Sequence, residues 1–280
     1  FSRDNRFGDG FVYEGWEGVE ELVALNHGNP DVRSHLLDAA AYAIERYGCD
    51  GIRLDVAYLL PHDFLKELSA RLHAIRKDIW LMGEVIHGDY AALLGHGMLD
   101  SITNYECYKG LWSSFNDRNL HEIGHSLGRQ FGPGGLLTAA VRNGRLPYNF
   151  ADNHDVSRVA STLTDERHLF PLYGLLWTMP GIPSVYYGSE YGLKGSKDSG
   201  DHALRPPVAA LEEAARNDRG AALARWIAEL NAARAASPAL RAGAYHELLV
   251  SSTGLVFERV LEDERVLVAV NADPYAVTLT

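Results

Sequence analysis

Gly51-Ile52-Arg53-Leu54-Asp55-Val56-Ala57 is a short apolar stretch that carries one arginine and one acid. Apolar residues recur at helical spacing before it, over residues 31–48, and again after it, from residue 61. A strand-like segment between two amphipathic helices indicates a βαβ unit and therefore a parallel sheet. Such folds place their functional side chains at the carboxyl ends of the strands, which is where Asp55 stands.

The same alternation continues along most of the chain. Asp31 is the expected N-cap of the first helix, Gly48 its expected end, and Pro61 the expected start of the next helix. Residues 1–30 show no sustained period, which predicts a loop. Further strands are predicted at 79–85, 101–108, 148–151 and 182–187, and further helices at 119–131, 165–179 and 220–236.

The pattern changes near residue 238. Short alternating segments follow at 245–251, 255–260, 266–271 and 275–280, separated by turn residues. This is typical of hairpins in a small antiparallel sheet. We therefore expect three parts, which are residues 1–30, an α/β part over 31–238, and the beginning of a C-terminal β domain over 239–280.

Composition restricts the setting and the partners. The 280 residues are 46% hydrophobic and carry a formal net charge of −11. An acidic surface argues against nucleic acid or an anionic membrane as a partner. Cys49 and Cys107 both adjoin apolar runs, so we expect buried free thiols and a cytoplasmic, reducing location. The chain begins at Phe1, so an upstream signal peptide would not be visible in it.

Acids follow three of the predicted strands. They are Asp55, Glu84 and the run Asp152-Asn153-His154-Asp155. Each alone is more readily explained as a helix cap, and the Arg53–Asp55 pair as a structural ion pair. Three such acids on three successive βα units are much less expected by chance. Converging carboxyl groups are what glycosidic cleavage requires, one to protonate the leaving oxygen and one to trap the sugar carbon.

These motifs, in this order, resemble those of the α-amylase family, glycoside hydrolase family thirteen. Three further stretches add to the resemblance, and the match covers essentially the whole chain. The six stretches are Gly51–Ala57, Gly83-Glu84-Val85, Asn153-His154-Asp155, Val23-Ala24-Leu25-Asn26, Gly181-Ile182-Pro183-Ser184-Val185-Tyr186-Tyr187-Gly188-Ser189-Glu190 and Gly200-Asp201-His202-Ala203-Leu204-Arg205-Pro206.

The resemblance implies a role for each strand-end residue. Asp55 would be the nucleophile of a retaining mechanism, Glu84 the general acid and then base, and Asp155 the third carboxylate, which holds sugar hydroxyls. Arg53 lies on the same strand face as Asp55, where its charge would keep the nucleophile ionised. His154, with the neighbouring Asn153, would contact the substrate beside Asp155.

Three more residues are implied on the substrate side. His87, three residues after the acid, resembles the arrangement in the neopullulanase, cyclomaltodextrinase and α-glucosidase branch, which implies short maltodextrins as substrates. Arg205 belongs to the stretch after the eighth strand. Tyr58-Leu59 stands where many amylases have Lys-His or Asn-Glu, so the acceptor side departs from the family pattern. We expect Tyr58 to contact substrate there.

The implied fold is the C-terminal portion, about strands four to eight, of a (β/α)8 TIM barrel, followed by the start of a small antiparallel β domain. Residues 1–30 would then end an inserted B-type loop domain. No cofactor is expected in this chain, and a calcium site of the family would lie upstream. Since five strands cannot close an eight-stranded barrel, we expect activity only with an upstream segment of roughly 150–250 residues.

Three alternatives remain at this point. A transglycosylase of the same family would share all three acids and differ only in the acceptor. A non-catalytic amylase-like binding module would be expected to lose one or more carboxylates. A metal hydrolase using His87, His154 and the Asp cluster lacks a ligand spacing typical of such sites.

Overall fold

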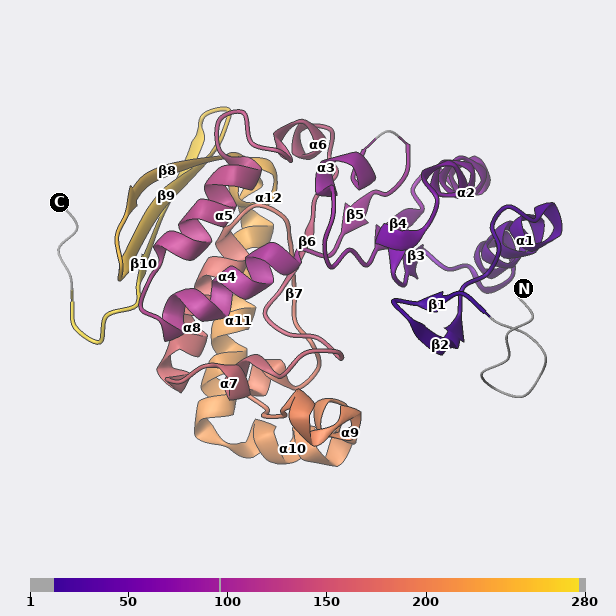
Figure 1. Cartoon of the computed structure of the whole chain (residues 1–280). Helices are drawn as coiled ribbons and strands as arrows, with labels where there is room; N and C mark the ends of the chain where they lie inside the picture. The colour runs from indigo at the N-terminus through magenta and orange to yellow at the C-terminus, as the bar shows by residue number, and fades with distance from the viewer. Residues whose placement is uncertain (1–12, 96, 277–280) are drawn as a thin grey trace. The chain divides into compact units, whose positions relative to one another are not determined.

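A computed structural model describes residues 13–95 and 97–276 of the chain (Figure 1). The chain forms two compact units. The first contains the residues up to Ile52 together with Leu60–Ile79, and the second contains Arg53–Leu59 and the chain from Trp80 onward. The second unit holds every strand-end acid that the sequence singled out.

The first unit contains a hairpin where a loop was predicted. Strands β1 (Gly15–Trp16) and β2 (Val19–Val23) pair antiparallel. The two residues between them, Glu17 and Gly18, have φ angles of 46° and 86°. Positive φ at both central residues is the geometry of a tight hairpin turn, whose twist matches that of the flanking strands. The prediction of a loop was wrong here because β1 has only two residues and β2 does not alternate apolar and polar residues.

Two helices complete this unit, α1 (Pro30–Tyr47) and α2 (His62–Ile75). The side chain of Asn29, not that of Asp31, caps α1 by accepting a hydrogen bond from the backbone N–H of Asp31. The prediction that Gly48 ends the helix is confirmed, since this glycine adopts the left-handed conformation of a C-terminal cap.

The second unit is built on parallel strands. Strand β3 (Gly51–Leu54), whose last residues belong to this unit, is followed in the sheet by β4 (Trp80–Gly83) and β5 (Ser101–Ile102). Strands β6 (Tyr148–Phe150) and β7 (Ile182–Ser184) also pair in parallel. A parallel bridge between Thr103 and Tyr148 joins the two groups. The predicted parallel α/β architecture is confirmed, and its numbering as strands four to eight stays a prediction.

One predicted strand is mostly helix. The segment 101–108 was predicted as extended, but β5 ends at Ile102 and helix α4 (Tyr105–Asn116) begins three residues later. The Asn104 side chain accepts a hydrogen bond from the backbone N–H of Cys107 at 3.2 Å and so starts the helix. The aromatic residues after it favoured a strand locally, and this cap overrides them.

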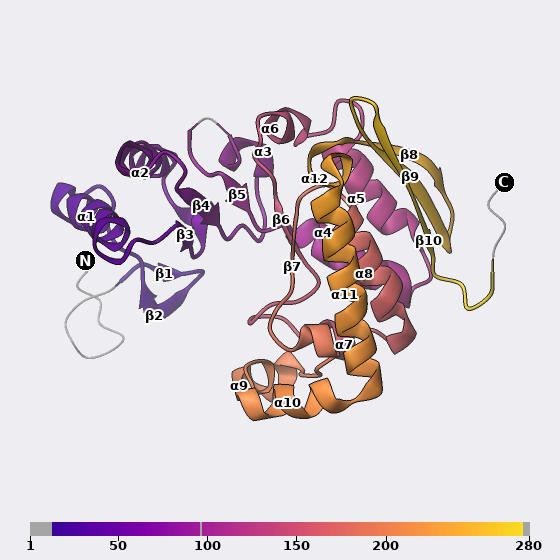
Figure 2. The same ribbon diagram turned by 180° about the vertical axis from the view of Figure 1, so that it is seen from behind.

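Helices cover the strands of this unit. Figure 2 shows the long helix α11 (Asp218–Ala236) running beside α8 (Leu169–Thr178), where the Trp226 indole N–H donates to the backbone oxygen of Phe170 at 2.9 Å. The helices of the unit are α3 (Tyr90–Leu93), α4, α5 (His121–Phe131), α6 (Thr138–Arg142), α7 (Val159–Thr162), α8 (Leu169–Thr178), α9 (Asp201–Leu204), α10 (Val208–Arg216), α11 (Asp218–Ala236) and α12 (Pro238–Ala242). Short 3-10 turns lie at Ala57–Leu59, Glu166–His168, Ser189–Tyr191 and Lys197–Ser199.

The C-terminal segments form the predicted antiparallel sheet. Its strands are β8 (Ala244–Val250), β9 (Gly254–Leu261) and β10 (Glu264–Asn271), with β9 in the centre. The sheet packs against α5 and α8 within the second unit. The last predicted strand, over 275–280, lies largely outside the described residues. The division into three domains at residues 30 and 238 stays a prediction.

A buried arginine ties this sheet to the helices. Arg259 on β9 is 1% exposed and donates to the backbone oxygens of Thr178 at 2.7 Å and Gly243 at 2.9 Å. Burial away from water lowers the pKa of Arg259 to about 9. Its hydrogen bonds to two carbonyl groups are what make this burial tolerable.

Both cysteines are free thiols, as predicted. Cys107 is buried as expected, but Cys49 is only half-buried, so the prediction of burial was wrong for Cys49. Within the part of the chain that the structure describes, every helix is too short or too polar to cross a membrane.

Candidate active site

The first two strand-end acids meet at one arginine. Asp55 directly follows β3, and Glu84 directly follows β4. The Arg53 guanidinium forms an ion pair with Asp55 through Nη1, and its Nη2 lies 3.0 Å from Glu84 Oε1. The Asp55 side chain is 71% exposed, whereas that of Glu84 is 7% exposed. The site thus holds one open and one enclosed carboxyl group beside the same fixed cation.

Backbone packing fixes the position of Glu84. A Cβ atom at Gly83 would lie 2.5 Å from a Leu99 methyl carbon and 2.8 Å from the Ala57 Cβ, so only glycine fits before the acid. The backbone N–H of Glu84 donates to Leu54 O at 2.8 Å, and its carbonyl accepts from the Ala57 N–H at 2.9 Å. The acid is therefore held from both sides by the neighbouring β3 segment.

A strained residue completes this arrangement. Val56, which follows Asp55, has a φ of 43°, a left-handed conformation that β-branched residues rarely adopt. In this conformation its backbone N–H donates to Glu84 Oε2 at 3.1 Å. Backbone strain of this kind persists only where the surrounding structure imposes it, and strained residues are common at functional sites.

Tyr105, the first residue of α4, links Glu84 to the third acidic motif. Its hydroxyl donates to Glu84 Oε1 at 3.4 Å and accepts from the Asn153 amide at 3.1 Å. Burial, reinforced by the negative charges nearby, raises the pKa of Tyr105 to about 12, so the hydroxyl keeps its proton. This role of Tyr105 could not be predicted from the sequence, because the contact joins residues 21 positions apart.

Asn153 also shapes the loop that carries Asp155. Its side-chain oxygen accepts from the backbone N–H groups of Asp155 at 2.8 Å and Val156 at 3.2 Å. This local turn presents Asp155, whose oxygens lie 2.9 Å from His154 Nε2 and 3.3 Å from Arg205 Nη2. The structure thus brings together four of the predicted residues, Asn153, His154, Asp155 and Arg205. Asn153 contributes by hydrogen bonds to the backbone of this loop and to the Tyr105 hydroxyl.

A buried network supports this loop. Asp152 is 3% exposed and accepts hydrogen bonds from the Ser189 hydroxyl and from the Val159 N–H at 2.8 Å. Burial raises the pKa of Asp152 to about 6. Arg158 is fully buried; it donates to Ser189 Oγ at 3.1 Å and lies over the Tyr186 ring. Asp152 stood inside the acidic motif, but its burial could not be predicted from spacing.

The remaining predicted site residues, Tyr58 and His87, lie on the segments that follow Asp55 and Glu84. The rings of Tyr58 and His87 are 4.5 Å apart and form a small aromatic pair. Tyr108, on α4, packs on the core side, where its ring stacks on that of Phe150 with the ring centroids 5.1 Å apart. Among the described residues, no three His, Cys, Asp or Glu side chains are grouped as metal ligands.

The arrangement suits acid–base chemistry joined to nucleophilic attack. An enclosed carboxyl group with a hydroxyl donor and a backbone donor has a fixed orientation, which a proton donor needs. An exposed carboxylate beside it can reach a bound molecule and is held in place by its ion pair with Arg53. Asp155, His154 and Arg205 supply further donors and acceptors at the end of β6.

The chain matches the sequence model of the alpha-amylase catalytic domain over residues 11–237. It is 30% identical over 196 residues to a cyclomaltodextrinase of Geobacillus thermopakistaniensis, covering 66% of this chain and 31% of that protein. It is 29% identical over 262 residues to a cyclomaltodextrinase of a Bacillus species, covering 92% of this chain and 45% of that protein. The chain therefore spans less than half the length of these two relatives.

Solved structures agree with this assignment. The cyclic α-maltosyl-(1→6)-maltose hydrolase of Arthrobacter globiformis superposes with a TM-score of 0.78 at 28% identity, covering 92% of this chain and 56% of that one. The same hydrolase has been solved in complex with maltose and with cyclic α-maltosyl-(1→6)-maltose.

Proposed function

Since this chain belongs to the α-amylase family of glycoside hydrolases, we propose that the protein carrying it hydrolyses α-glucosidic bonds in maltodextrins, with retention of configuration. The bonds are α-1,4 and, in branched or cyclic substrates, also α-1,6. The setting is cytoplasmic, as the name of a related intracellular maltogenic amylase of Bacillus subtilis suggests.

The observation that carries the proposal is the shared contact of Arg53 with Asp55 and Glu84. One guanidinium between two carboxyl groups holds them close together, as a retaining mechanism requires. In that mechanism the carboxyl groups are about 5–5.5 Å apart, whereas inversion needs room for a water molecule between them.

The residues then take successive roles. Glu84 protonates the glycosidic oxygen as its bond to the anomeric carbon breaks, and the Asp55 carboxylate forms a covalent ester with that carbon. Water next attacks the same anomeric carbon and gives its proton to Glu84, while the bond from that carbon to the Asp55 oxygen breaks and releases the carboxylate. Asp155 and His154 hold sugar hydroxyls, and Arg53 holds the nucleophile in position through their ion pair.

Substitution of the two acids tests this assignment in the whole protein, with maltoheptaose as substrate. Asp55→Asn lowers kcat by roughly 1000-fold or more, because the amide cannot form the ester. The control Asp117→Asn changes an exposed aspartate at the end of α4 and leaves kcat unchanged. Near-normal turnover of Asp55→Asn would show that another group is the nucleophile.

Glu84→Gln separates the two steps. With a glucosyl fluoride, whose leaving group needs no proton, this variant still forms the ester but cannot activate water. Intact-protein mass spectrometry then detects one added glucosyl unit, which Asp55→Asn does not acquire. If the glucosyl unit appeared on any residue other than Asp55, the proposed roles would be wrong.

The same intermediate could be captured by a sugar hydroxyl in place of water. Products longer than the substrate at high maltoheptaose concentration would identify a transglycosylase. A protein that binds maltoheptaose but cleaves none of it would be the non-catalytic alternative, which the intact set of three acids disfavours.

A further inference from the structure

Helix α5 carries two histidines one helical turn apart. They are His121 and His125, at positions i and i+4, and both side chains are exposed. Residues spaced in this way lie on the same face of a helix, and two histidines so placed can hold one metal ion between their imidazole nitrogens. Among the described residues, neither imidazole makes a hydrogen bond or an ion pair, so both are available for a ligand.

A groove of about 710 Å³ lies between this face of α5 and strand β8, within the second unit. Both histidines line it, together with Gly124 and Gly128 from the helix and Glu247 from the strand. A Cβ atom at Gly124 would lie 3.1 Å from Glu247 Oε2, so this carboxylate reaches the helix surface at the residue before His125. The groove therefore brings a carboxylate to the face that carries the two imidazoles.

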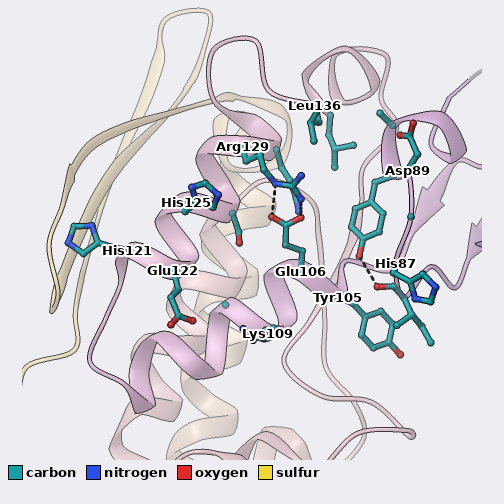
Figure 3. Close-up of a pocket in the computed structure, with 18 of the residues that line it drawn as sticks. His87, Asp89, Tyr105, Glu106, Lys109, His121, Glu122, His125, Arg129 and Leu136 are labelled. Atoms are coloured by element: carbon teal, nitrogen blue, oxygen red, sulfur yellow. Dashed lines mark hydrogen bonds and ion pairs between the residues drawn. The ribbon is translucent and has the colours of Figure 1, made fainter.

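Glu122, which follows His121 in the sequence, belongs to a different side of the helix. Its carboxylate accepts a hydrogen bond from the Ser113 hydroxyl of α4 at 2.5 Å, and Figure 3 shows it directed toward that helix. The rest of α5 after His125, residues 126–131, contains no acid, histidine or cysteine. A third protein ligand for an ion between the histidines must therefore come from another element, and Glu247 is the carboxylate at hand.

The surroundings favour a cation over an anion. Arg129 also lines the groove, but its charge is balanced by an ion pair with Glu106 of α4, shown as a dashed line in Figure 3. Glu247 adds a negative charge, and the formal net charge of the chain is −11, which attracts cations. Imidazole nitrogens with one carboxylate are a common donor set for Zn²⁺.

We propose that His121, His125 and Glu247 bind one divalent cation of the Zn²⁺ class, with water in the remaining coordination position. In the structure these side chains are not gathered as a ligand group, but all three are exposed, so they can turn toward one ion without disturbing the core. The ion joins α5 to β8 and thereby stabilises the packing of the C-terminal sheet on this helix. Its role is structural and does not depend on the proposed glycosidase activity.

Calorimetric titration of Zn²⁺ into the whole protein, after dialysis against a chelator, tests this proposal. Loss of a hydrogen-bond partner of a metal ligand already costs about 10–100-fold in affinity, so loss of a ligand itself should cost at least about tenfold. We expect this fall in His121→Ala, in His125→Ala and in Glu247→Gln. The double histidine variant should be little worse than either single one, because one imidazole cannot chelate. Unchanged affinity in the double histidine variant would overturn the proposal.

His246→Ala is the matched control. His246 also lines the groove, but it pairs with Glu258 across the sheet, and alternation along β8 directs its side chain to the face opposite that of Glu247. Its loss should leave the Zn²⁺ affinity unchanged. Saturating Zn²⁺ should also raise the Tm of the natural protein and of this control, but not that of the double histidine variant. An equal rise in all three proteins would place the ion elsewhere and contradict the proposed site.

Discussion

The guanidinium of Arg53 contacts Asp55 through one terminal nitrogen and Glu84 through the other, at 3.0 Å from Oε1. The side chain is 32% exposed, so the contact with Asp55 is partly open to solvent. The rigid fork of the guanidinium fits two acceptors at once, which a single ammonium group cannot do. The geometry of the two acids therefore depends on this residue as well as on their strands.

Arg53→Lys should keep the positive charge but lose the shared contact. We expect kcat to fall by about 100-fold with KM changed less, because the two acids lose their fixed spacing. Steady-state kinetics on maltoheptaose measure this, and circular dichroism checks that the variant is folded. A loss below about threefold would mean that charge alone is sufficient.

At position 56 a glycine variant should be more stable than an alanine variant, which reverses the usual order. At most positions glycine is less stable than alanine by roughly 0.5–1 kcal/mol. The φ of 43° strains any residue with a Cβ atom, so Val56→Gly should be more stable than Val56→Ala by about 1 kcal/mol. Urea unfolding measures both, and Ala43→Gly in α1 provides the normal order. If alanine were the more stable at position 56, the strain would not be present in solution.

Asp152 should make stability fall as the pH rises. Its pKa, raised by burial from 3.8 to about 6, means that the folded state binds a proton that the unfolded state releases between these values. The proton stabilises the fold below pH 4, and this stabilisation is lost as the pH passes 6. A shift of about two units corresponds to roughly 3 kcal/mol.

Asp152→Asn removes this dependence. The unfolding free energy of the variant minus that of the natural protein should therefore rise between pH 4 and pH 7, by up to roughly 3 kcal/mol. Urea titrations at a series of pH values measure the difference, in which the other titrating groups cancel. A difference independent of pH would show that Asp152 has an ordinary pKa.

Arg158 should be required for stability. It is fully buried and donates to the backbone oxygens of Tyr187 at 2.7 Å and Leu204 at 2.8 Å. Arg158→Met leaves these acceptors without partners, so we expect a loss of about 3 kcal/mol or more in unfolding free energy. Arg225→Met, at an exposed position of α11, should change it by less than about 0.5 kcal/mol. Equal effects would contradict the role of the buried contacts.

Much of the fold could be predicted because its signals are local. The parallel strands, most of the helices and the C-terminal hairpins follow periodicities of 3.6 and 2 residues, and the family assignment followed from the ordered motifs. The predicted ends of helices and strands were wrong where a single contact decides them. The Asn29 and Asn104 caps and the turn at Glu17-Gly18 depend on one hydrogen bond or one pair of dihedral angles.

The sequence by itself placed Asp55, Glu84 and Asp155 at the ends of strands, because residue type and strand position are both written along the chain. Only the tertiary structure showed that Arg53 joins two of these acids and that Tyr105 and Asn153 connect Glu84 to the third motif. These contacts depend on the register and spacing of segments far apart in sequence. The chemistry is encoded locally, whereas its geometry exists only once the strands are paired.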